Sequence, residues 1–177
     1  PEYYLIRQEA REITNKTGLD VDFLLEEDGR GVYLLAGTKQ SNYPTDPRPG
    51  DREFLHSTAA GKAILAEMPP AKVDAIIDRW GLPSETENTM TDRETLKSEL
   101  ETIAVKGYAL NDQENRIGLR AVSAAISNPN GTVLGGLSLT GPTYQIDEQM
   151  FNEQMPRLVK RFSQEIESKL QNLSETL

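Results

Sequence analysis

The segment Leu55–Ala63 (LHSTAAGKA) contains residue types that could bind an anion. A helix is expected to begin near its Ser-Thr pair, and the first turn of a helix presents unpaired backbone N–H groups and a partial positive charge. The small side chains of Ala59 and Ala60 would let a carboxylate or phosphate approach these N–H groups. A Walker A phosphate loop is excluded, because His56 and Ala63 stand where that motif has Gly and Ser or Thr. The residues alone favour a packed helix start and leave the anion site open.

His56 and Ser57 are neighbours whose side chains could act as a general base and a nucleophile. No nucleophile-elbow pattern surrounds Ser57, so we favour a structural His56 that caps the helix or is held by a hydrogen bond. The polar run Asn111–Glu114 (NDQE) could supply acid–base carboxylates, but an exposed turn has the same composition, and we favour the turn. We therefore predict that the chain is not an enzyme, with a hydrolase as the less favoured alternative.

Ser138 and Thr140 stand two residues apart in a β-prone run, so their side chains should point to the same face of a strand. Two hydroxyls on one face could hold a small polar ligand, and they could equally belong to a solvated sheet face. Gly135 and Gly136, just before them, indicate a β-bulge or the close approach of another backbone. Both interpretations of the hydroxyls stay open at this point.

The composition excludes several classes of protein. With 19 Lys and Arg against 28 Asp and Glu, the 177-residue chain has a net charge of −9, so by itself it should bind DNA poorly. It has no Cys and one His, which excludes disulfides and thiolate sites and gives no indication of a metal or other cofactor. No apolar run is long enough to span a membrane, and no signal peptide is recognisable, so we expect a cytoplasmic protein.

The hydrophobic pattern predicts an α+β domain in which helices pack on an antiparallel sheet. Helices are expected at 3–17, from a Ser57 or Thr58 cap to 66, at 70–80, from a Thr91–Glu94 capping box to 106, and at 147–172. Extended segments are expected at 21–27, 31–37, 108–111, 119–127 and 132–140, and a loop at 38–52.

Four segments carry a recognisable pattern: LHSTAAGKAILAEMP at 55–69, TMTDRETLKSEL at 89–100, KGYALNDQENRIGLR at 106–120 and GTVLGGLSLTGP at 131–142. In order and spacing, they resemble the effector-binding domain of the IclR family of transcriptional regulators. The resemblance implies a GAF-like or profilin-like fold, with an antiparallel sheet of about six strands flanked by helices on both sides. It also implies a linker helix at 1–18 and an effector-binding domain at 19–177, without the winged helix-turn-helix domain that precedes them in the family. The acidic balance further resembles haloarchaeal members.

The same resemblance implies a pocket for a small carboxylic-acid effector, such as glyoxylate, pyruvate or an aromatic carboxylate, between the helix start and the sheet. Within that pocket, Ala59 and Ala60 would offer backbone N–H groups, Ser138 and Thr140 their hydroxyls, and Leu119 an apolar wall. The family's regulators form homodimers or homotetramers. The resemblance therefore implies that assembly here, with DNA bound only through the missing N-terminal domain and no membrane contact.

Two positions depart from the family's pattern. Asn111 stands where the family often has Asp, and Ala121 stands where it often has Cys. Asn can donate and accept hydrogen bonds without adding charge, whereas Ala removes a weak thiol contact and enlarges the pocket. We therefore expect a bulkier or less polar acid than glyoxylate. A stand-alone oligomerisation module with a vestigial pocket is the alternative on the same fold.

Overall fold

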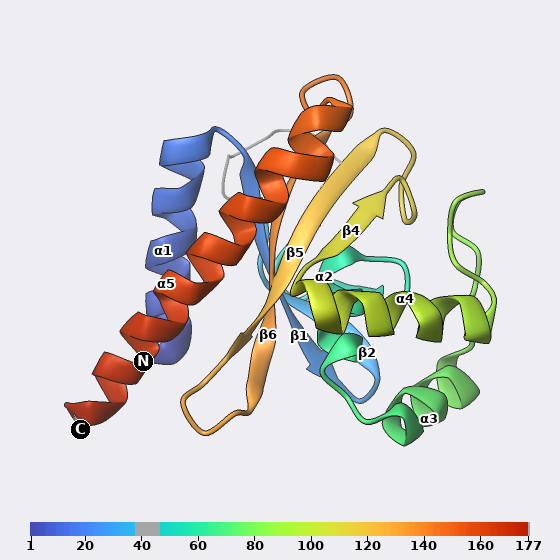
Figure 1. Ribbon diagram of the computed structural model, residues 1–177, viewed down its shortest axis with the longest axis horizontal. Helices are drawn as coiled ribbons and strands as arrows, with labels where there is room; N and C mark the ends of the chain where they lie inside the picture. Colours follow the sequence, from blue (N-terminus) through green and yellow to red (C-terminus); the bar gives the residue numbers. More distant parts are fainter. Residues whose placement is uncertain (38–46, 177) are drawn as a thin grey trace.

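The computed structural model describes residues 1–37 and 47–176, which form a six-stranded antiparallel sheet with helices on both faces (Figure 1). The strands lie in the order β3-β2-β1-β6-β5-β4. They are β1 (Asp20–Glu27), β2 (Arg30–Leu35), β3 (Arg52–Phe54), β4 (Ala109–Asp112), β5 (Leu119–Ser127) and β6 (Val133–Pro142). The helices are α1 (Glu2–Thr17), α2 (Ala59–Ala66), α3 (Pro70–Trp80), α4 (Arg93–Lys106) and α5 (Met155–Glu175), and a π-helical turn, η1 (Met150–Gln154), precedes α5. The predicted α+β class is confirmed.

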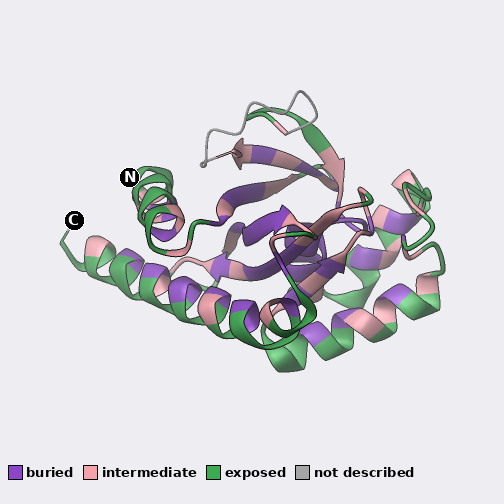
Figure 2. Cartoon of the chain, turned by 90° about the horizontal axis from the view of Figure 1, so that it is seen from above, coloured by how far each residue is buried: buried purple, intermediate pink, exposed green. Residues whose placement is uncertain are grey.

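One face of the sheet is apolar and lies against α1 and α5, which run side by side (Figure 1). Where β1 pairs with β6, Val21 is opposite Leu139 and Phe23 is opposite Leu137, and all four side chains are buried. The buried residues of α5 form a stripe on the side of the helix that packs onto them (Figure 2). This confirms the apolar stripe predicted for the last helix.

The other face of the sheet carries a second apolar cluster, which includes Leu24 and the buried residues of α2, and beside it a polar region of the central strands. Successive residues of a strand point to opposite faces. On this face Asp22 of β1 is paired with Ser138 of β6, and Asp20 is paired with Thr140. The two hydroxyls predicted to share a face do so. The face is covered by α2, and α4 packs in turn on α2.

The start of α2 approaches β6 closely at Gly136, as the paired glycines in the sequence indicated. A Cβ atom on Gly136 would lie 2.9 Å from the Cα atom of Ala60. Within the helix start, a Cβ atom on Gly61 would clash with the backbone of Leu55. Glycine is therefore needed at 136 for α2 to lie against β6, and at 61 for the segment before α2 to pass close to the helix.

The helix starts are set by side-chain caps. Thr58 caps α2, since its hydroxyl accepts a hydrogen bond from the N–H group of Gly61 at 3.0 Å. The capping box predicted to begin at Thr91 is wrong by one residue, because Asp92 is the N-cap of α4 and accepts from the N–H group of Thr95 at 2.9 Å. A carboxylate gains more than a hydroxyl from the partial positive charge at a helix start.

Two segments differ from their predicted structure. Part of the expected loop, 38–46, lies outside the described residues, and its end enters β3, which pairs with β2 at the edge of the sheet. The last helix begins with the π-helical turn η1 rather than as a regular α-helix. Pro156 follows this turn, and a wider turn relieves the clash between a proline ring and the carbonyl group four residues earlier.

We expect Gly136→Ala to lower the free energy of unfolding by about 1–3 kcal/mol, because the added methyl group must push α2 away from β6. Gly141→Ala is the matched control on the same strand, since its Cβ atom would meet only the end of the Ile146 side chain, at 3.0 Å. Urea denaturation of both variants measures the difference. Equal stabilities would contradict the close contact between α2 and β6.

Candidate ligand-binding site

A cavity of about 650 Å³ opens on the polar face of the sheet, beside the starts of β1 and β5, the end of β6 and the β4–β5 loop at 113–118. Of the residues predicted to bind the ligand, Leu119 and Thr140 line this cavity. Three further lining residues, Tyr33, Glu53 and Arg116, were not singled out in the sequence. They come from β2, β3 and the β4–β5 loop, and no local motif connects them.

Most of the other predicted residues lie together next to the cavity and are buried. Asn111 of β4 is paired with Ala121 of β5, which is paired with Thr140 of β6, so the three form a row across the sheet. Ser138 lies two residues before Thr140 on the same face. The side-chain amide of Asn111 donates to the carbonyl oxygen of Ser57 at 3.4 Å, which joins this row to the start of α2.

Several hydrogen-bond donors in the site have no acceptor in the described structure or make only one long bond. Among the described residues, none accepts a hydrogen bond from the N–H groups of Ala59 and Ala60, the first two of α2. The hydroxyl of Ser138 likewise has no partner in the described part of the chain. The hydroxyl of Thr140 makes one long bond, of 3.3 Å, to a backbone carbonyl oxygen. These are the donors that a carboxylate requires.

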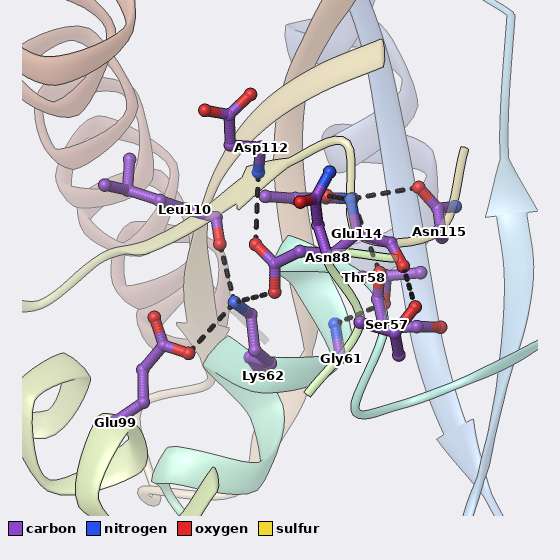
Figure 3. Close-up of polar contacts among 12 residues, drawn as sticks. Ser57, Thr58, Gly61, Lys62, Asn88, Glu99, Leu110, Asp112, Glu114 and Asn115 are labelled. Atoms are coloured by element: carbon purple, nitrogen blue, oxygen red, sulfur yellow. Dashed lines mark hydrogen bonds and ion pairs between the residues drawn. The ribbon is translucent and has the colours of Figure 1, made fainter. Parts of the chain in front are cut away.

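Lys62 of α2 lies at the centre of a buried polar network (Figure 3). Its side chain is completely buried, and its Nζ atom donates to Glu114 Oε1 at 2.7 Å, to the carbonyl oxygen of Leu110 at 2.7 Å and to Glu99 Oε2 at 3.2 Å. This role of Lys62 was not predicted from the sequence. A lysine between the small and apolar residues of a short helix is the signal that could have indicated it.

The run Asn111–Glu114 ends β4 and begins a loop, but it is not the exposed turn that the composition suggested. Asn111 and Glu114 are buried. The N–H group of Glu114 donates to Asn111 Oδ1 at 2.8 Å, and Glu114 Oε2 accepts from the N–H group of Asp112 at 3.1 Å. Burial raises the pKa of Glu114, and Lys62 opposes that rise. The carboxylate therefore stabilises the loop and is not free for acid–base chemistry.

His56 and Ser57 are both held by other groups. The Nε2 atom of His56 lies 2.9 Å from the carbonyl oxygen of Pro83, and the hydroxyl of Ser57 donates to Glu85 at 2.7 Å. Burial lowers the pKa of His56. The structural interpretation of His56 agrees with these contacts, because the imidazole and the hydroxyl are not hydrogen-bonded to each other.

Among the described residues that line the cavity, the acidic side chains are Asp20, Asp22 and Glu53, and the basic one is Arg116. Burial, together with nearby carboxylates, raises the pKa of Glu53 to about 7. Burial and the charge of Asp22 also raise the pKa of Tyr33, whose hydroxyl therefore stays protonated at neutral pH.

Two other kinds of interaction find no support in the described residues. No three of their acidic or imidazole side chains are arranged to hold a metal ion. None of their helices is both long enough and apolar enough to cross a membrane.

The family model described as "Bacterial transcriptional regulator IclR C-terminal" matches residues 5–168. Among curated proteins, the chain is 29% identical over 172 residues to the probable HTH-type transcriptional regulator ArcR of Halobacterium salinarum, covering 96% of this chain and 65% of the relative. It is 30% identical over 147 residues to the HTH-type transcriptional regulator XynR of Escherichia coli, covering 81% and 58%. The chain thus spans less than two thirds of the length of these relatives.

Solved structures show the same fold. The IclR protein of Thermotoga maritima superimposes with a TM-score of 0.87 and 31% identity, over 97% of this chain and 69% of that one. A mutant inducer-binding domain of the PobR transcription factor from Acinetobacter, in complex with 3-hydroxybenzoic acid, superimposes with a TM-score of 0.81 and 21% identity, over 90% and 94%.

We expect Lys62→Met to lower the free energy of unfolding by about 3–5 kcal/mol, because it leaves Glu114 buried without its cation. Adding Glu114→Gln should restore part of that loss. Lys72→Met is the matched control and should cost at most about 1 kcal/mol, since Lys72 pairs with Glu26 on the surface. Chemical denaturation of the variants measures these differences, and equal costs for the two lysines would contradict the role of the network.

We expect the free energy of unfolding to fall as the pH rises from about 4.5 to about 7, because folded Glu53 holds its proton more tightly than the unfolded residue does. Glu53→Gln should remove this slope and stabilise the protein at pH 8 by about 1–3 kcal/mol, a range reduced for partial solvent screening. Thermal denaturation across this pH range, with Glu101→Gln of α4 as control, measures the effect. Parallel curves for Glu53→Gln and the unsubstituted protein would refute it.

Proposed function

Because the chain belongs to the IclR family of transcriptional regulators and forms their C-terminal effector-binding domain, we propose that it binds a small organic carboxylate and thereby alters DNA binding by an attached N-terminal domain. That N-terminal domain would be a winged helix-turn-helix. The proposed site lies between the start of α2 and the row formed by Asn111, Ala121 and Thr140.

The observation that carries this proposal is a set of donors near the cavity, of which those of Ala59, Ala60 and Ser138 have no partner among the described residues and that of Thr140 makes one long bond. The N–H groups of Ala59 and Ala60 have the partial positive charge of a helix start, and the hydroxyls of Ser138 and Thr140 lie on the sheet face that α2 covers. Leu119 contributes an apolar surface to the cavity. A carboxylate placed here would complete the hydrogen bonds that the described residues leave open.

The connection between α1 and β1 supports a route from the ligand to the DNA-binding domain. Residues 1–18, proposed as the linker, form α1 and its Gly18 cap, and the buried side of α1 is part of the core of the 19–177 unit. β1 follows directly and contributes Asp20 and Asp22 to the cavity. A ligand that shifts β1 would therefore shift α1, and a coupling of about 1–3 kcal/mol would change DNA affinity about 5–150-fold.

We further propose a cytoplasmic homodimer or homotetramer, because DNA-binding domains of this kind read palindromic operators in pairs. The full-length regulator, and not this chain alone, would bind DNA. A protein in which the ligand is sensed and not converted should still bind its ligand after His56→Ala, whereas a hydrolase that used this imidazole would lose turnover.

We expect a thermal-shift screen to identify at least one ligand among glyoxylate, pyruvate, larger 2-oxo acids and hydroxylated benzoates. A ligand at 100 times its dissociation constant should stabilise the domain by about 2.7 kcal/mol. Binding should be tighter for an acid bulkier than glyoxylate, given Asn111 and Ala121.

We expect Ser138→Ala and Thr140→Val each to weaken binding of that acid by about 10–100-fold, because each removes a hydrogen bond to a charged group. Thr132→Val, in the exposed β5–β6 turn, is the control and should bind normally. Isothermal titration calorimetry measures the affinities. Unchanged affinity in both site variants would overturn the assignment of the site, and a screen without any hit would favour a vestigial pocket.

A further inference from the structure

We infer that the ligand of this cavity carries a protonated amine in addition to its carboxylate, so that the chain binds a small amino acid in preference to a simple organic acid. This inference rests on the proposed function and specifies its ligand. The residues that carry it are Tyr33 and Glu53, which line the cavity from the adjacent strands β2 and β3.

Tyr33 supplies a polar group that the protein itself does not use. The residue lines the cavity and is only 8% exposed. No described residue is hydrogen-bonded to the Tyr33 hydroxyl. In the described part of the chain, no side-chain polar atom that lacks a hydrogen-bond partner is fully buried, so this hydroxyl must be partly accessible. The small exposed part of Tyr33 therefore includes the hydroxyl, which opens to the cavity. A neutral phenol can accept a hydrogen bond from an ammonium group.

Glu53 supplies an unpaired carboxyl group. It is half-buried in the wall of the cavity, yet its side chain makes no hydrogen bond or ion pair within the described part of the chain. Arg116, on the opposite loop, is close enough to act electrostatically on both Glu53 and Tyr33 but does not pair with Glu53. The charge of Glu53 is therefore left for a cation that enters the cavity.

The surrounding charges favour a ligand with a positive end. Asp20 and Asp22 stand directly across from Thr140 and Ser138, the hydroxyls proposed to hold the ligand's carboxylate. A ligand with only a negative charge would be repelled by Glu53, whereas a zwitterion places its ammonium group beside that carboxyl group.

The cavity also sets the order of the ligand's groups. The ligand's carboxylate would lie at the Thr140 side of the cavity, toward the start of α2, whose Ala59 and Ala60 do not themselves line it, and its amine would point toward Glu53. Leu119 and Ile117 line the same space with apolar surface, which suits a methylene chain between the two charged ends. A linear amino acid with separated charges fits this arrangement.

The test is a calorimetric titration of the 177-residue chain with linear amino acids from β-alanine to 6-aminohexanoate. Each is compared with the hydroxy acid and the unsubstituted acid of the same carbon number, and with the corresponding alkylamine. We expect one amino acid to bind at least about tenfold more tightly than its three counterparts. Glu53→Gln should abolish this preference, and Glu101→Gln, which removes the same charge far from the cavity, should retain it.

The other outcomes separate this inference from the proposed function. If a hydroxy acid or an unsubstituted acid binds as tightly as its amino acid, the amine site is refuted and the carboxylate sensor stands. If an alkylamine binds as tightly as the amino acid, the carboxylate contacts are refuted and the proposed function fails. If no compound of the panel binds, the inference fails, and the wider acid screen decides the proposed function.

Discussion

The burial of the Lys62 ammonium group is the constraint on which the arrangement of the site depends. A fully buried cation is stable only when its charge and its hydrogen bonds are matched, and Lys62 obtains both from Glu114, Glu99 and the carbonyl oxygen of Leu110. These groups belong to the β4–β5 loop, α4 and β4, so one charge fixes three elements against α2. Because the β4–β5 loop also lines the cavity, the packing of α2 and the shape of the cavity are set together.

Side chains of the central strands alternate between the two faces of the sheet, so one face contributes to the core and the other contributes to the proposed site. In β1 and β6, every second residue enters the apolar core under α1 and α5, and the residues between them face α2, where Asp20, Asp22, Ser138 and Thr140 form a polar region next to a second apolar cluster that contains Leu24. Buried polar groups are costly when they lack partners. The unused donors at Ala59, Ala60 and Ser138 therefore mark the place where a ligand would contribute most to stability, and β1 connects that place directly to α1.

The sequence predicted the elements well where local physics decides them. Apolar periodicity located the helix at 3–17 and the strand at 119–127, and Gly135-Gly136 indicated the close approach that the contact between Gly136 and Ala60 confirms. The sequence-based prediction was inaccurate where more than one local structure was compatible with the residues. Thr91 and Asp92 are both acceptable helix caps, and the π-helical turn before Pro156 depends on how the helix docks on the sheet.

The sequence by itself therefore determined the class of fold, the family and the shared strand face of Ser138 and Thr140. Those features rest on short-range periodicity and on motifs that are contiguous in the chain. Only the tertiary structure placed Tyr33, Glu53 and Arg116 around one cavity and Lys62 among its carboxylates. These contacts depend on the order and register of strands that are distant in sequence, so no local sequence pattern predicts them.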